Sequence, residues 1–132
     1  MAYHSFEDLE VWKRSCRLTV RVHNMFKNSK EYVLRDQMTR SALSIPSNIA
    51  EGAERSSPLE FIRFLNIAKG SAAELRTQLY IASEVGAIHI AERNELKNEL
   101  IEISSMLQSL IRSLKRKTNM KKTKSSNLKL QT

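Results

Sequence analysis

Residues 37–52, Gln-Met-Thr-Arg-Ser-Ala-Leu-Ser-Ile-Pro-Ser-Asn-Ile-Ala-Glu-Gly, combine a helical repeat with a residue that opposes a helix. Apolar residues recur in and before this run at steps of three and four, which places them on one helix face: Leu34, Met38, Ala42, Ile45 and Ile49. Pro46 interrupts the pattern, because proline offers no N–H to the carbonyl of Ala42 and costs about 3 kcal/mol inside a helix. The small residues around it suit close helix contact. The run therefore predicts a kinked, closely packed helix.

The same run carries a family resemblance. Residues 40–52 resemble the signature of the bacterial four-helix-bundle protein family. Two further segments fit the family pattern, Phe-Glu-Asp-Leu-Glu-Val-Trp at residues 6–12 and the run from Phe64 to Leu79, so that the likeness covers about residues 5–115. Some members of this family are encoded in an intervening sequence of large-subunit ribosomal RNA genes. Others resemble the accessory variability determinant of a diversity-generating retroelement. The resemblance implies a homopentamer, a ring of bundles whose positive surface engages nucleic acid and, in the retroelement relatives, a reverse transcriptase.

Composition limits the fold and the cellular setting. The chain has 132 residues, which suits one domain, and only three glycines and two prolines, which disfavours a turn-rich β fold. No segment resembles a signal peptide or a membrane span, so we expect a cytoplasmic protein with no membrane partner. The single cysteine, Cys16, excludes an internal disulfide framework and a cysteine-rich zinc site.

Hydrophobic periodicity predicts four helices, over residues 5–28, 30–54, 58–86 and 91–116. The third begins with a capping box, in which Ser57 caps the helix, Pro58 takes its first position and Glu60 follows. Short connections favour antiparallel neighbours. The predicted fold is all-α, an antiparallel up-down-up-down four-helix bundle over residues 1–117, followed by a basic, disordered tail over residues 118–132.

Charge is distributed unevenly along the chain. Residues 1–111 hold 14 Lys and Arg against 14 Asp and Glu, whereas residues 112–132 hold eight basic residues and no acidic one. A basic tail can bind a polyanion, and it can also serve only to keep a protein in solution.

The first helix predicts both a subunit interface and a binding surface. Its apolar arc is wider than a monomeric bundle needs, and this favours a homo-oligomer. The candidate interface residues come from the first and third helices: Val11, Leu18, Val22, Met25, Phe61 and Phe64. A basic stripe runs along the same first helix and, with the start of the tail, supplies the candidate nucleic-acid contacts: Lys13, Arg14, Arg17, Arg21, Arg112, Lys115, Arg116 and Lys117. Ordinary solvated charge is the alternative explanation of the stripe.

Catalytic and metal-binding patterns are not found in the sequence. The three histidines, His4, His23 and His89, have no ligand spacing, and Cys16 reads as a buried, inert thiol. Gly70 predicts a close crossing with the second helix. Polar side chains of the second and third helices predict a structural network: Arg40, Ser44, Asn48, Glu51 and Glu74. We therefore expect no enzyme activity, no catalytic residue, no metal and no cofactor.

These observations favour a homo-oligomeric accessory protein that binds RNA or DNA through phosphate contacts, without reading sequence. Base stacking is not expected, because the chain has only eight aromatic residues. The resemblance adds a reverse transcriptase as a candidate partner. The alternative is a protein–protein scaffold in which the charge plays no part, and a regulator of the toxin–antitoxin kind is a weaker third possibility.

Overall fold

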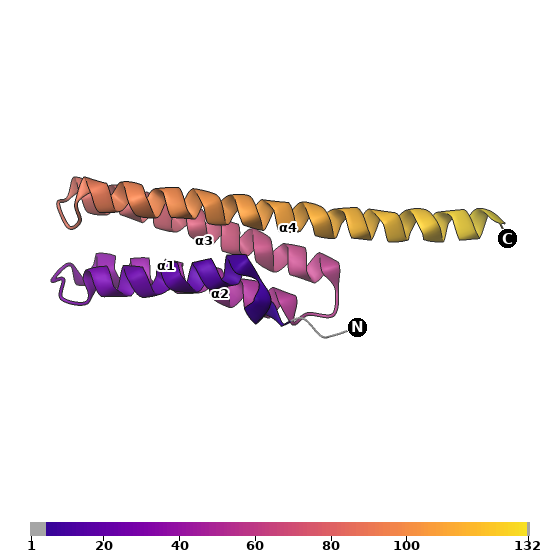
Figure 1. Cartoon of the computed structure of the whole chain (residues 1–132), viewed down its shortest axis with the longest axis horizontal. Coiled ribbons are helices and arrows are strands. Elements are labelled where there is room, and N and C mark those ends of the chain that lie inside the picture. Colours follow the sequence, from indigo (N-terminus) through magenta and orange to yellow (C-terminus); the bar gives the residue numbers. More distant parts are fainter. Residues whose placement is uncertain (1–4, 132) are drawn as a thin grey trace.

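The computed structural model describes the backbone of residues 5–131 and the side chains of residues 5–120. A short 3-10 turn, η1 (Phe6–Asp8), precedes four helices: α1 (Glu10–Phe26), α2 (Tyr32–Ala53), α3 (Pro58–Glu84) and α4 (Ile90–Gln131). The helices lie side by side, and each runs opposite to the one before it, while α4 continues well past the end of the others (Figure 1). No strand occurs within residues 5–131. The predicted all-α four-helix fold is confirmed.

One hydrophobic core joins the four helices. In α3 the alternation of leucine and alanine fills it, because six residues at heptad spacing have no exposed surface: Leu65, Ala68, Ala72, Leu75, Leu79 and Ala82. Leu96, Leu100, Ile103 and Leu107 do the same in α4. The contact between α2 and α3 is the most extensive of the bundle, and the contact between α1 and α4 is the least extensive of the adjacent pairs.

The proline of α2 is accommodated by a neighbouring helix. The α2 helix continues through Pro46, which is buried. The carbonyl of Ala42, which has no N–H partner at position 46, accepts a hydrogen bond of 3.0 Å from the Thr19 hydroxyl of α1. The same hydroxyl lies 2.8 Å from the carbonyl of Ser15 in its own helix. The freed carbonyl therefore links α1 to α2.

The ends of α3 follow the sequence signals closely. The Ser57 hydroxyl accepts a hydrogen bond from the Glu60 N–H at 3.3 Å, and Pro58 is the first helical residue. At the other end Gly86 has a φ of 76°. The N–H of Ala87 bonds the carbonyl of Ala82 at 2.8 Å, as a Schellman motif requires. Both predicted boundaries of this helix are confirmed within two residues.

Two boundaries differ from the prediction. The first helix is interrupted at Leu9, whose extended backbone separates η1 from α1. The last helix does not end near Arg116 but continues to Gln131. No glycine or proline follows Gly86, so nothing in the local sequence stops the helix. The division of the chain into a bundle and a tail at residue 117 stays a prediction. Residues 1–4 and 132 lie outside the described residues.

The close helix approach predicted at Gly70 lies elsewhere. A Cβ atom added at Gly70 would meet nothing within 4 Å, whereas one added at Gly52 would lie 2.6 Å from the Cβ of Phe64. Gly52 stands in the last turn of α2, and Phe64 in the second turn of α3. The tight contact is therefore at the α2–α3 turn.

Candidate nucleic-acid interface

The residues predicted for the subunit interface pack mainly inside one chain. Val11, Leu18, Val22 and Phe64 are buried in the isolated bundle. Met25 and Phe61 are partly buried against the same core. Ser15 also lies on the side of α1 that faces the core, and it is fully buried. Its hydroxyl donates to the carbonyl of Val11 at 2.7 Å, so the buried hydroxyl has a hydrogen-bond partner.

Some residues of the wide apolar arc of α1 face away from the core. Val20 is 59% exposed, and His23 is exposed as well. Because Ser15 is polar, it interrupts the apolar repeat on the side of α1 that packs against the core. The sequence pattern alone therefore does not identify that side.

Most of the basic stripe on α1 is paired with carboxylates. Arg14 makes two hydrogen bonds to Glu99 of α4, at 2.7 and 2.8 Å. Arg21 pairs with Glu95 of α4 at 2.8 Å, and Arg17 pairs with Glu10 at 3.1 Å. Lys13 is exposed and, within the described part of the chain, has no carboxylate partner. The stripe therefore holds α1 to α4 and presents little uncompensated charge.

The Arg14–Glu99 pair should make the stability of the bundle depend on pH. Hydrogen bonding to Arg14 lowers the pKa of Glu99, and the same bond raises the pKa of Arg14. A carboxylate with a lowered folded pKa stabilises the fold above its unfolded pKa of about 4.3, and that contribution is lost as the pH falls through the folded value. The two side chains are 27% and 30% exposed, so the pair is only partly screened by water.

We therefore expect Glu99→Gln to lower the free energy of unfolding by about 1 kcal/mol near neutral pH and to have almost no effect at about pH 2. Urea unfolding of both proteins over a pH series measures the difference. An equal loss at every pH would contradict the assignment to this ion pair. Glu102→Gln is the control, because Glu102 lies exposed one turn further on with no ion pair among the described residues.

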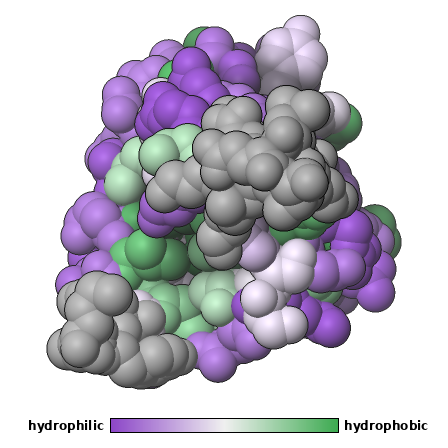
Figure 2. All heavy atoms as spheres, turned by 90° about the vertical axis from the view of Figure 1, so that its right-hand side faces the viewer, coloured by the Kyte–Doolittle hydropathy of each residue, from purple (hydrophilic) through white to green (hydrophobic). Residues whose placement is uncertain are grey.

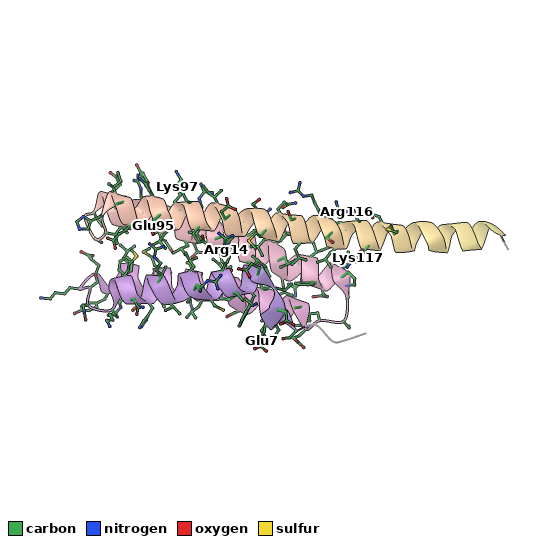
Figure 3. The ribbon with its side chains drawn as sticks, in the orientation of Figure 1. Glu7, Arg14, Glu95, Lys97, Arg116 and Lys117 are labelled. Carbon is green, nitrogen blue, oxygen red and sulfur yellow. The ribbon has the colours of Figure 1, made fainter. Side chains whose placement is uncertain are left out.

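The α4 helix separates its charges onto two flanks. Glu95 and Glu99 face α1, where they meet Arg21 and Arg14. Arg93 and Lys97 stand on the other flank, where Arg93 reaches Ser83 of α3. Figure 3 shows Glu95 directed toward α1 and Lys97 directed to the opposite side of α4. The acidic flank pairs with Arg14 and Arg21 of α1, and among the described residues Arg93 and Lys97 have no carboxylate partner.

A groove of about 580 Å³ lies between α3 and α4 on this basic flank. We call it the α3–α4 groove, and its lining contains three basic residues and no acidic one: Ala73, Arg76, Thr77, Tyr80, Arg93 and Lys97. Arg76 and Lys97 are exposed and make no ion pair with any described residue. Further along the same two helices, the Lys69 ammonium donates to the neutral side chain of Gln108. The groove was not among the predicted contacts.

The predicted contacts at the end of the bundle are all exposed. They stand on α4 where it leaves the other helices, as Figure 3 shows for Arg116 and Lys117: Arg112, Lys115, Arg116 and Lys117. None of the four pairs with a carboxylate in the described part of the chain. Seen toward this end, hydrophobic residues gather at the centre and hydrophilic ones form the rim (Figure 2).

Comparisons with known proteins agree on the family of this chain. The family model of the 23S rRNA-intervening sequence protein matches residues 7–109. The chain belongs to this family. A crystal structure from Bacteroides thetaiotaomicron, of a protein of unknown function from the S23 ribosomal protein family, is 32% identical. The TM-score is 0.73, and the match covers 76% of this chain and 97% of that one. No curated protein matches. The predicted family resemblance is thus confirmed, and neither description names an enzyme.

The structural network in this intervening-sequence protein is smaller than predicted. The Ser44 hydroxyl lies 2.8 Å from that of Ser71, and the Asn48 amide donates to Ser44 at 2.7 and 2.9 Å. Glu74 accepts a hydrogen bond from Ser41 at 3.1 Å. Two predicted members stand apart, because Glu51 pairs with Arg55 and Arg40 is exposed with no bonded partner among the described residues.

No other chemical site emerges from the described side chains of this family member. Burial raises the pKa of the Cys16 thiol, which favours the unreactive protonated form. Within the described residues, no three His, Cys, Asp or Glu side chains come together as metal ligands. Among the same residues no helix has both the length and the apolar character to cross a membrane.

Proposed function

We propose that this intervening-sequence protein is a non-enzymatic, homo-oligomeric accessory protein that binds RNA or DNA through phosphate contacts. One observation carries the proposal, namely that carboxylates pair the three arginines of the α1 stripe, whereas the cations of the α3–α4 groove and of the end of α4 have no carboxylate partner among the described residues. A cation that is already paired with a carboxylate gains less from a phosphate than an unpaired one. The family description, which names an intervening sequence of 23S rRNA, supports RNA as the first ligand to try.

The binding mode follows from the kind of residues present. Arg76, Lys97 and the four cations at the end of α4 can each displace a counterion from a phosphate, which gives affinity but no sequence preference. We propose that the groove cations and those at the end of α4 act together on one nucleic-acid strand. Affinity should therefore fall steeply as salt concentration rises.

We propose a different interface for the homo-oligomer, because most of the residues predicted for it are buried within one chain. Large apolar side chains are exposed on the described surface of every helix, including Val33 at 79%, Leu59 at 60% and Ile90 at 62%. We propose that subunits meet through side chains of this exposed class, and the pentamer remains the expectation from the resemblance. Light scattering tests it, and a clean monomer at micromolar concentration would reject the oligomer.

Charge variants matched in number test the site of nucleic-acid binding. We expect the pair Arg76→Gln and Lys97→Gln to weaken RNA binding about tenfold at low salt and to reduce the slope of log affinity against log salt by about 1.5. The pair Arg17→Gln and Arg21→Gln removes two carboxylate-paired charges from α1, and should change the affinity by less than about threefold. Fluorescence anisotropy of a labelled RNA over a salt series measures both.

Each other result has a definite meaning. An equal loss in both pairs would show no preference for the groove over the α1 stripe and would reject the groove as the binding site. Binding that does not change with salt, or no binding at low salt, would favour the protein–protein scaffold. A reverse transcriptase partner rests on the resemblance alone, and co-purification with such an enzyme would test it separately.

A further inference from the structure

The α3–α4 groove contains an aromatic ring as well as charge. Tyr80 is 58% exposed and lines the groove beside three basic residues. The guanidinium of Arg93 stands over this ring, 5.8 Å from its centroid. An exposed aromatic face next to cations is the arrangement on which single-stranded nucleic acids stack their bases.

Neutral partners hold Arg93 in place. Its guanidinium donates to the Ser83 hydroxyl at 3.2 Å and to the side-chain oxygen of Asn94 at 3.2 Å. These bonds orient the guanidinium without compensating its charge, in contrast to Arg14, whose partner is the carboxylate of Glu99. Arg93 is therefore both positioned and electrostatically available to an anion.

The remaining cations stand one helical turn from these two residues. Arg76 precedes Tyr80 by four residues in α3, and Lys97 follows Arg93 by four residues in α4, so each pair shares a helix face. Both cations line the groove, one from each helix. A phosphate on either side of a base stacked on Tyr80 would lie near one of them. The volume of about 580 Å³ is within the range of small-molecule sites.

We propose that the α3–α4 groove is a subsite for an unpaired nucleotide, whose base stacks on Tyr80 and whose flanking phosphates contact Arg76, Arg93 and Lys97. This inference rests on the proposed nucleic-acid function and names its ligand class as single-stranded. A base within a duplex keeps its faces covered by its neighbours, so only an unpaired one can use the ring. The exposed ring also makes an acidic peptide the poorer candidate, because carboxylates use the cations alone.

Two probes of different secondary structure test the subsite. We expect Tyr80→Ala to weaken the binding of a labelled single-stranded oligouridine about tenfold and that of an RNA duplex by less than about twofold. Tyr80→Phe keeps the ring and should keep the affinity for both probes. Because Tyr80 is exposed, circular dichroism melting should be the same for all three proteins. Photo-crosslinking with 5-iodouridine, followed by mass spectrometry, should place the modified residue at Tyr80.

The outcomes separate the subsite from the proposed function. If the native chain binds both probes at low salt and Tyr80→Ala changes neither, the subsite is rejected and the nucleic-acid function stands. An equal loss on both probes, or displacement of oligouridine by an equal concentration of polyglutamate, would show a general anion groove and reject the subsite. If the native chain binds neither probe, both proposals fail.

Discussion

We expect Thr19→Val to lower the free energy of unfolding of the bundle by about 2 kcal/mol, although it replaces one side chain by another of nearly the same shape. The hydroxyl of Thr19 donates to the carbonyl of Ala42, which Pro46 deprives of its partner within α2. Ala42 is fully buried, so water cannot replace the lost bond without opening the contact between α1 and α2. Thr77→Val is the matched control, because Thr77 is exposed and its hydroxyl bonds only the carbonyl of Ala73 in its own helix. The control should change stability by less than about 0.5 kcal/mol.

A double-mutant cycle with Pro46→Ala isolates this effect. Alanine at position 46 restores an N–H four residues after Ala42, so the carbonyl regains a partner inside α2. In that background we expect Thr19→Val to cost less than about 1 kcal/mol, which means a coupling of about 1 kcal/mol or more. Urea unfolding of the four proteins gives the cycle. Equal costs of Thr19→Val with and without the proline would contradict the role assigned to the hydroxyl.

Local signals in the sequence were sufficient for most of the fold. The period of α2 predicted most of its buried residues, the four predicted ranges located the helices, and the Ser57 cap predicted the start of α3. These local signals did not predict which side of α1 packs against the core. The apolar arc of that helix is wide, and the part that packs includes Ser15, a buried polar residue whose hydroxyl bonds its own backbone. A hydrophobicity pattern counts such a serine as polar. The side of α1 that packs inside the bundle was therefore predicted to be a subunit interface.

The candidate site shows a different limit. The sequence lists every cation, but it does not say which of them meets a carboxylate from another helix. The pairs Arg14–Glu99 and Arg21–Glu95 join residues more than seventy positions apart. A helical projection of α4 contains part of the answer, since Glu95 and Glu99 fall on one flank and Arg93 and Lys97 on the other. Deciding which flank faces α1 still requires the tertiary arrangement.

We expect Gly52→Ala to destabilise the bundle by about 2 kcal/mol, against the usual gain when alanine replaces glycine in a helix. The new Cβ atom would lie 2.6 Å from the Cβ of Phe64 and 3.3 Å from the carbonyl oxygen of Phe61. Neither is the flexible end of a side chain, so the start of α3 has to move away from the end of α2. Arg55 and Arg63 stand over the ring of Phe64, at 5.0 and 4.6 Å from its centroid, and that movement would disturb them too.

Gly70→Ala makes the same chemical change in α3, where nothing lies within 4 Å of the new atom. Here the helix propensity acts alone, and we expect stability to rise by about 0.5–1 kcal/mol. The two variants should therefore shift the urea midpoint in opposite directions at similar slope. A gain at both positions would mean that α2 and α3 do not approach closely at Gly52. A loss at both would place an unseen neighbour over Gly70, and light scattering of that variant would show whether a second subunit supplies it.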